Sequence, residues 1–408
     1  MVVASTVSVV SFQAAATTKS VAAPNASSET QAVSTAASAF LNTLNAEQRQ
    51  KVSFSFVPEK TASAAKFPHL MPNGLNGPGS PDGGPNGPPP GNPQPGKSET
   101  DKGPPGGPPN GGPGKGGGLP DFVGEKFGDA VWSNYPVSDV PRPGLQMGSL
   151  TSTQRAAAMH LLKVMLSPKG YQKVLDIMGG DQALADAGQH FSAGRDVYTI
   201  AILGKPSATS PWMVQFGGHH LGLNVVMDGQ HGVMTPTLTG AQPAVYSSNG
   251  KTTRVLAGES DKAFTLLAAL DDSQRKEAVL NYKVSDLVLG PGHDGETILP
   301  EGLKGSAMTP TQRALLLDLI KEWAGIVNDA YAKPRLAELQ AGLQDTYFAW
   351  SGPTTHMPNR NGSSYYRIQG PKVIIEFSPQ GVGGDPTMHV HTIYRDPTND
   401  YGHAFTLP

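Results

Sequence analysis

A tract rich in proline, glycine and asparagine, Pro72 to Pro120, divides the chain into a short and a long part. The tract holds almost no apolar side chains, so it cannot bury enough surface to offset the entropy of ordering. Its glycines do not recur at every third position, which argues against a collagen triple helix. We therefore expect a flexible surface insertion within a fold built by the flanking residues, the alternative being a proline-rich ligand for an aromatic groove.

The remaining composition narrows the classes of partner and cofactor. With 31 basic and 33 acidic side chains, the net charge of −2 gives no reason to expect nucleic acid or an anionic membrane surface as a partner. No run of about 18 apolar residues is present, so we expect no membrane span. The chain has no cysteine, which excludes disulfides, thiolate metal sites and iron–sulfur clusters. Any metal ion must therefore be held by nitrogen and oxygen.

The first residues suggest export. Met1 to Ala16 are small and apolar, but they lack the basic residues that open a secretory signal. The segment rich in Ser, Thr and Ala that follows, Ala14 to Ala36, is typical of the leader of an exported protein. We expect a disordered leader over residues 1–36, a single domain over residues 37–408, and a periplasmic or extracellular location.

Apolar residues recur at two spacings outside the tract. Helical spacing predicts several helices, one of which begins at Ser167-Pro168 and is expected to end at Met178-Gly179-Gly180. Alternating spacing predicts strands. The helices are expected over Thr30–Leu44, Ser152–Leu166, Asp261–Leu280 and Thr309–Leu343, and the strands over Val197–Leu203, Trp212–Phe216, Leu221–Met227, Val233–Leu238, Thr346–Trp350, Tyr365–Gln369, Val373–Phe377 and Met388–Tyr394. Because helices and strands segregate along the chain, we predict an α+β fold in which helices flank an antiparallel sheet.

Two histidine-bearing stretches, Gln215–Asn224 and Met388–Asp396, carry the densest chemical signal. Each is interpreted as a strand, which fixes the direction of a ring more firmly than a loop does. Neutral imidazole is the commonest protein ligand of zinc, copper and iron, and it is also the usual general base near neutral pH. If the two strands lie side by side, they bring three or four imidazoles into one pocket.

Strand alternation assigns a direction to each side chain of the first stretch. His220 and Asn224 share one face, whereas His219 shares the other face with apolar residues. We predict that His220 is a metal ligand and that Asn224 or Gln215 orients a bound water or substrate. His219 is expected to be a core histidine bonded to a backbone carbonyl, unless a bulge at Gly217-Gly218 turns it toward the metal as a further ligand.

The second stretch supplies two histidines two residues apart. His389 and His391 project from the same face of a strand, which is a workable arrangement for two metal ligands. Glu376 lies on the preceding strand among apolar neighbours, where a carboxylate needs a partner such as a metal or a protonated histidine. We predict a catalytic or ligating role for Glu376, with a solvated position at a strand end as the alternative.

The chain resembles the domain-of-unknown-function family numbered 3500. The resemblance covers about Ala37 to Tyr401 and rests on two histidine motifs and several shorter segments. These are Trp212–Asn224, Thr239–Ala244, Leu256–Glu259, Tyr347–Gly352, His389–His391, Arg395–Pro397 and Asn399–Gly402. Two segments depart from the family pattern: the tract Pro72–Pro120 and the approach to the last histidines, Ser378–Asp385. The family implies no activity, so the resemblance supports the site and leaves the reaction open.

The sequence lacks the motifs of several common enzyme classes. It contains no nucleophile elbow, no phosphate-binding glycine loop, no dinucleotide fingerprint and no His-Glu-x-x-His helix. Our leading hypothesis is a metal-dependent hydrolase that acts on a small molecule or peptide, with zinc, copper or iron as the divalent metal. The alternatives are a mononuclear copper or iron oxidoreductase, a non-catalytic exported binding protein, and a histidine cluster that serves only the core.

Overall fold

The computed structural model describes residues 25–58, 61–68, 121–189, 194–382 and 384–406. The proline- and glycine-rich tract, residues 72–120, lies outside the described residues, and so do residues 1–24 of the expected leader. The last part of that leader belongs to the first helix, α1 (Ala26–Asn42), which packs against α3 (Ser152–Met165). The folded part of the chain therefore includes residues on both sides of the tract.

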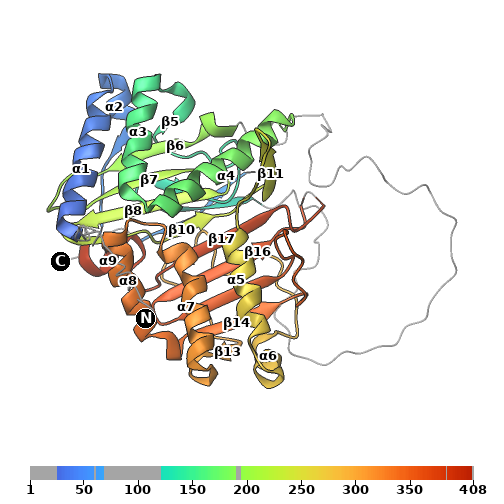
Figure 1. Ribbon diagram of the computed structural model, residues 1–408. Helices are drawn as coiled ribbons and strands as arrows, with labels where there is room; N and C mark the ends of the chain where they lie inside the picture. Colours follow the sequence, from blue (N-terminus) through green and yellow to red (C-terminus); the bar gives the residue numbers. More distant parts are fainter. Residues whose placement is uncertain (1–24, 59–60, 69–120, 190–193, 383, 407–408) are drawn as a thin grey trace, which may run out of the picture.

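One large, mostly antiparallel sheet forms the centre of the protein (Figure 1). Its strands are β1 (Ser53–Phe54), β5 (Leu145–Gln146), β6 (Thr199–Leu203), β7 (Trp212–Gly218), β8 (Leu221–Asp228), β9 (His231–Val233), β10 (Thr237–Thr239), β13 (Leu303–Lys304), β14 (Tyr347–Ser351), β15 (Tyr365–Gly370), β16 (Val373–Pro379) and β17 (Val390–Arg395). They run in the order β1-β6-β7-β8-β10-β17-β16-β15-β14-β13, with β5 paired to β6 and β9 to β8. The predicted α+β fold with an antiparallel sheet is confirmed.

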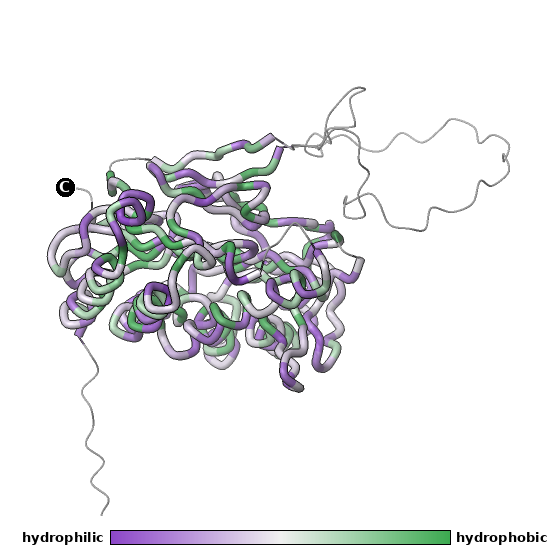
Figure 2. The backbone as a smooth tube through the Cα atoms, turned by 90° about the horizontal axis from the view of Figure 1, so that it is seen from above, coloured by the Kyte–Doolittle hydropathy of each residue, from purple (hydrophilic) through white to green (hydrophobic). Residues whose placement is uncertain are grey.

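Helices cover one face of this sheet, as Figures 1 and 2 show. Beside α1 and α3 they include α2 (Ala46–Val52), α4 (Pro168–Asp186), α5 (Ala257–Ala268), α6 (Asp272–Ala278), α7 (Pro310–Ala324) and α8 (Asp329–Ala341). The largest hydrophobic core lies between this helical layer and the sheet and includes Phe216, Ile375 and Trp323. No helix within the described ranges is long and apolar enough to cross a membrane.

The opposite face of the sheet carries a thinner layer. It consists of a small sheet, β2 (Ser63–Phe67), β3 (Phe122–Phe127) and β4 (Ala130–Trp132), and of the loop 281–302. Trp132 packs there against Leu238 and Ile393 in a separate apolar cluster, with Leu287 of the loop at its edge. His391, which has the same strand parity as Ile393, lies on this side.

The two halves of the large sheet repeat each other. In one half β5, β6, β7, β8 and β10 pair in succession, and in the other half β13, β14, β15, β16 and β17 pair in the same way. The halves meet where Thr237 of β10 pairs with Tyr394 of β17. A pseudo-two-fold axis therefore passes through this residue pair.

The sequence carries a trace of the repeat that our sequence reasoning missed. The motif Thr-x-Thr-Gln-Arg occurs at the start of α3, Thr151–Arg155, and again at the start of α7, Thr309–Arg313. In both copies the first Thr caps the helix and the Gln closes a capping box. Gln154 then exchanges hydrogen bonds with Gln48, and Gln312 does the same with Gln274. The repeat thus extends from strand register to side-chain contacts.

Three predicted helical segments have wrong bounds, and one of them, Asp261–Leu280, forms two helices, α5 and α6. The helix expected to end at Met178-Gly179-Gly180 continues as α4 to Asp186. A Cβ atom on Gly179 would lie 2.2 Å from the hydroxyl of Tyr246, so this glycine permits close packing and does not end the helix. The block predicted as one helical region, Thr309–Leu343, forms two helices, α7 and α8, with Gly325 as the C-cap of the first.

Candidate metal centre

His220 lies in the two-residue turn that joins β7 to β8. Gly218 and Leu221 pair on either side of the turn, so the expectation that both neighbouring histidines lie within a strand is wrong. His220 has a φ of 59°, a conformation that residues other than glycine adopt rarely and at a cost. Its backbone N–H donates to the carbonyl of Asn134 at 3.1 Å. The turn and this bond together fix the direction of its ring.

The other two histidines lie at the start of β17, on the far side of β10 from β8. His391 is in the strand and His389 directly precedes it. The Nε2 atoms of His220 and His389 are 2.9 Å apart, and those of His389 and His391 are 3.2 Å apart. All three residues are buried, and their candidate ligand atoms lie within 4.8 Å of one another. The fold thus brings the two histidine-bearing stretches together at one point.

The outer nitrogens of the two β17 histidines determine the tautomers of these rings. The Nδ1 atom of His389 lies 3.0 Å from the carbonyl oxygen of Val382, and that of His391 lies 3.2 Å from a carboxylate oxygen of Asp286. Neither oxygen can donate a hydrogen bond, so each Nδ1 must carry the proton. Each Nε2 then presents a lone pair to the centre, which is the form that binds a metal.

Two of the three spacings between the inner nitrogens are close to those around a small metal ion. Two nitrogens bound at 2.0–2.1 Å with a tetrahedral angle are about 3.3–3.4 Å apart. The spacings of 2.9 and 3.2 Å are slightly shorter, whereas the group as a whole spans up to 4.8 Å, so the rings must move to bind one ion together. The His220–His389–His391 group can therefore hold a divalent metal ion.

Burial keeps the rings of His220 and His389 neutral. Desolvation lowers the pKa of His220 well below its usual range, and the neighbouring imidazoles lower it further. Desolvation and the adjacent His391 lower the pKa of His389 to about 3. Protons therefore compete weakly with a cation at neutral pH.

His219 lies outside this group. Its Nδ1 atom is 2.9 Å from a carboxylate oxygen of Asp181 on α4, and its ring packs on that of His220 with 3.8 Å between centroids. Burial lowers the pKa of His219, although the bond to Asp181 acts in the opposite direction. The residue is a buried histidine bonded to a carboxylate, where a backbone carbonyl was expected. A role as an additional ligand remains a prediction.

Gln215 and Asn224 pair with each other across β7 and β8. The Gln215 amide donates to the Asn224 side-chain oxygen at 2.8 Å, and the Asn224 amide donates to the carbonyl of Pro236 at 2.9 Å. Both side chains are buried. The two side-chain amides have four polar atoms, and these bonds use three of them inside the protein. The predicted role in orienting water or substrate remains a prediction.

Glu376 is fully buried on β16 and is held by three donors. The backbone N–H groups of Val288 and Leu289 each donate to its carboxylate at 2.7 Å, and the Tyr365 hydroxyl donates at 2.6 Å. Burial raises the pKa of Glu376, while these three bonds lower it. The alternative of a solvated strand end is wrong, because the partner of this carboxylate is the loop 281–302. Its catalytic role remains a prediction.

Sequence reasoning missed the residues that hold the β17 histidines from outside. Asp286 lies in the loop 281–302, which has no periodic pattern, and Val382 contributes only its backbone. Burial acts to raise the pKa of Asp286, but the hydrogen bonds from His391 and Leu287 lower it. Asp385, from the segment that departs from the family pattern, is exposed and bonded to Thr387 and Arg360. Among the described residues, its side-chain hydrogen bonds go to Thr387 and Arg360 and not to the three histidines.

The pseudo-two-fold axis generates a second corner that lacks this ligand set. The turn between β15 and β16 holds Lys372 at the position of His220. Where Ser378 pairs with His391, the equivalent pair in the other half joins Val226 to Val233. The same register places His231 at the position of His389, so the second corner keeps one of the three imidazoles. The complete trio is present in only one corner and is therefore not a requirement of the fold.

The α+β fold and the buried histidine trio define a class of candidate metal-binding proteins. A family model described as protein of unknown function (DUF3500) matches residues 126–403. The chain belongs to this family, as the resemblance of its histidine motifs implies. The matched region contains all three histidines and Asp286. No curated protein and no solved structure matches the chain.

Proposed function

We propose that His220, His389 and His391 bind one divalent metal ion and that the protein is a metal-dependent hydrolase. The proposal rests on one observation: the Nε2 atoms of His389 and His391 lie 3.2 Å apart, and each directs a lone pair toward the other. A buried contact between two acceptors is repulsive unless a cation lies between them. The absence of the trio from the pseudo-equivalent corner supports a functional role.

Three neutral nitrogen ligands leave coordination positions open. A metal ion held in this way lowers the pKa of a bound water toward neutrality and so supplies hydroxide for hydrolysis. The chain contributes the orientation of the rings: Asp286 positions His391, and the carbonyl of Val382 positions His389. Such outer contacts fix the tautomer and raise the basicity of the ligands. About half of the Asp286 side chain is exposed, so the residue that positions His391 lies at the protein surface, whereas the three histidines are buried.

The experiment is hydrolysis by metal-free protein reconstituted with zinc, with 4-nitrophenyl acetate and 4-nitrophenyl phosphate as probes. The proposal predicts turnover that appears with zinc and is lost in His389→Ala. His293→Ala, which changes an exposed histidine in the loop 281–302, is the matched control and should turn over like the parent. Turnover with zinc that persists in His389→Ala would contradict the proposed site.

Nitrogen ligands also accept copper and iron, so the reaction class depends on which metal restores activity. Stoichiometric copper or iron with oxidase activity and no hydrolysis would replace the hydrolase with an oxidoreductase. A bound metal with neither activity would indicate a non-catalytic binding protein. Either outcome would reject the hydrolytic activity but would still support metal binding by the three histidines.

A further inference from the structure

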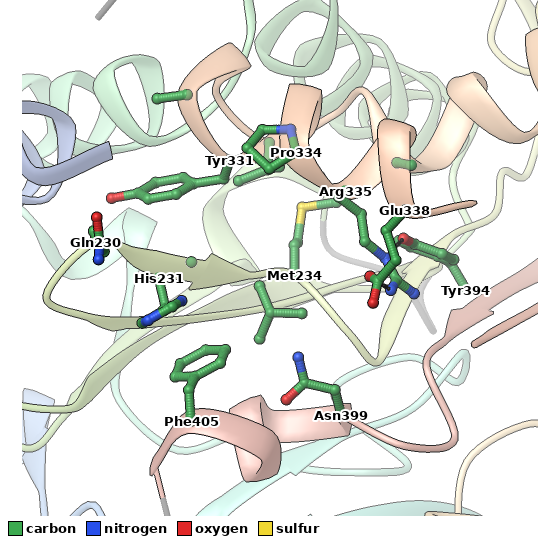
Figure 3. A pocket seen from close by; sticks show the side chains of 15 residues that line it. Gln230, His231, Met234, Tyr331, Pro334, Arg335, Glu338, Tyr394, Asn399 and Phe405 are labelled. Atoms are coloured by element: carbon green, nitrogen blue, oxygen red, sulfur yellow. Dashed lines mark hydrogen bonds and ion pairs between the residues drawn. The ribbon is translucent and has the colours of Figure 1, made fainter. Parts of the chain in front are cut away.

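Apart from the histidine centre, the structure has a cavity between α8 and the β9–β10 region, and none of the residues that line it belongs to that centre (Figure 3). Its volume is about 310 Å³, at the lower end of the range for small-molecule sites. Tyr331 and Pro334 lie on one side, and His231 and Phe405 lie on the other. Buried apolar side chains form the base, including Val233, Met234, Ala324 and Val327. The cavity thus has an apolar interior between ring-bearing walls.

The charged groups at one end of the cavity neutralise one another. Arg335 forms ion pairs with Glu338 and with the buried Asp396, and Lys372 pairs with Glu338. Two cations and two carboxylates leave no net charge. An ionic ligand would have to lose its hydration without gaining a counter-ion, which is costly. The cavity therefore favours an uncharged ligand.

Two hydrogen-bond donors at the same end lack acceptors among the described residues. The side-chain oxygen of Asn399 accepts the backbone N–H of Ala404 at 2.9 Å, which directs the Asn399 amide nitrogen toward the cavity (Figure 3). The hydroxyl of Tyr394 accepts from the Nε atom of Arg335 at 3.3 Å, so its own proton is left to donate. Two donors call for an acceptor oxygen on the ligand.

We propose that this cavity binds a small uncharged aromatic molecule that carries a carbonyl or hydroxyl oxygen. The oxygen accepts hydrogen bonds from the Asn399 amide and the Tyr394 hydroxyl. The ring lies over Val233 and Val327, between Phe405 and Pro334. The site is independent of the histidine centre and of any hydrolytic activity there.

The probe is benzamide, compared with benzoate and benzylamine, which have similar shape but carry charge. Binding is followed by NMR of the ¹³C-labelled methionine methyl groups, with the Met234 signal identified from a Met234→Leu variant. We expect benzamide to shift the Met234 signal in a saturable manner. The two ions should bind at least about tenfold more weakly, because burial of an unpaired charge is unfavourable.

Two variants test the donors. Asn399→Asp keeps the acceptor for Ala404 but removes the amide donor, and Tyr394→Phe removes the hydroxyl. Each should weaken benzamide binding by about threefold to tenfold, as expected for one hydrogen bond. Asn249→Asp, the same change in the hairpin between β11 (Val245–Ser248) and β12 (Lys251–Arg254), should bind like the parent. Equal affinity in parent and both cavity variants, equal binding of all three probes, or no Met234 shift up to the solubility limit of benzamide would overturn the proposal.

Discussion

The Nε2 atoms of His389 and His391 lie 3.2 Å apart although both rings carry their proton on Nδ1. Two charges could relieve the resulting repulsion: a proton shared between the rings or a metal ion. Burial and the proximity of His391 lower the pKa of His389 to about 3, so His389 itself does not hold a second proton at neutral pH. A metal ion bound by both rings would remove the repulsion, and its binding is the central claim of the proposed function.

Removal of the Asp286 carboxylate should weaken metal binding without removing a ligand. In Asp286→Ala the Nδ1 atom of His391 loses its acceptor, and we expect zinc affinity to fall by about 10- to 100-fold. Competition with a chromophoric chelator measures the change. Asp385→Ala, an exposed carboxylate near the same histidines in sequence, is the control and should bind zinc like the parent. Equal affinities for all three proteins would reject a positioning role for Asp286.

The metal-free protein should lose stability as the pH falls below about 6.5, and His389 should account for part of the loss. The unfolded chain takes up a proton on this residue near pH 6.5, whereas the folded protein does so only near pH 3. Between these values the unfolded state binds more protons. The free energy of unfolding therefore decreases as the pH decreases, by up to about 1.4 kcal/mol per pH unit for this residue. Urea unfolding with a chelator present, at several pH values, measures the slope.

His389→Gln should reduce this slope, because the titrating group is gone. His293→Gln changes an exposed histidine and should leave the slope unchanged. If parent and His389→Gln show the same dependence on pH, the neutral buried state assigned to His389 is incorrect.

The repeated glutamine contacts should contribute similarly in both halves of the fold. Gln154→Leu and Gln312→Leu each remove a capping box and leave the facing glutamine without its partner. We expect each to lower the free energy of unfolding by about 1–3 kcal/mol. Gln172→Leu on the exposed side of α4 should change it by less than about 0.5 kcal/mol. A large loss in one half and none in the other, measured by urea unfolding, would show that the halves are not energetically equivalent.

Glu376→Gln separates a structural role from a catalytic one. The carboxylate accepts three donors that converge on it, and an amide offers only one oxygen to them. We expect a loss of about 1–3 kcal/mol in the free energy of unfolding, with zinc affinity unchanged. Glu277→Gln, an exposed change on α6, is the stability control. If Glu376→Gln keeps full stability and abolishes turnover, the catalytic role predicted from the sequence is supported.

The fold class and the meeting of the two histidine stretches could be predicted from sequence because both depend on local patterns. Apolar alternation placed most strands, and the spacing of His389 and His391 placed both rings on one face. The position of His220 was predicted on the wrong grounds, since the two-residue turn, not strand alternation, directs its ring. His220 nevertheless faces the site as predicted, because the strand that follows the turn begins at Leu221 with the expected alternation of side chains.

The supporting residues could not be predicted, since they come from segments without a pattern. Asp286 lies in an irregular loop, and its contact with His391 spans 105 positions in the sequence. The carboxylate of buried Glu376 is bonded by backbone N–H groups of the same loop. Contacts made by the backbone cannot be predicted from residue types. The internal repeat did leave a readable signal in the two Thr-x-Thr-Gln-Arg motifs. A search for repeats before the search for periodicity would have found it.

The most direct test of the central claim is metal analysis of untagged protein purified without chelator or nickel resin, combined with anomalous scattering from its crystals. We predict one divalent metal ion per chain, with the anomalous peak between the Nε2 atoms of His220, His389 and His391, and loss of the metal in His220→Ala and His389→Ala. Protein that contains no stoichiometric metal and gains none on incubation with zinc, copper or iron would contradict the account.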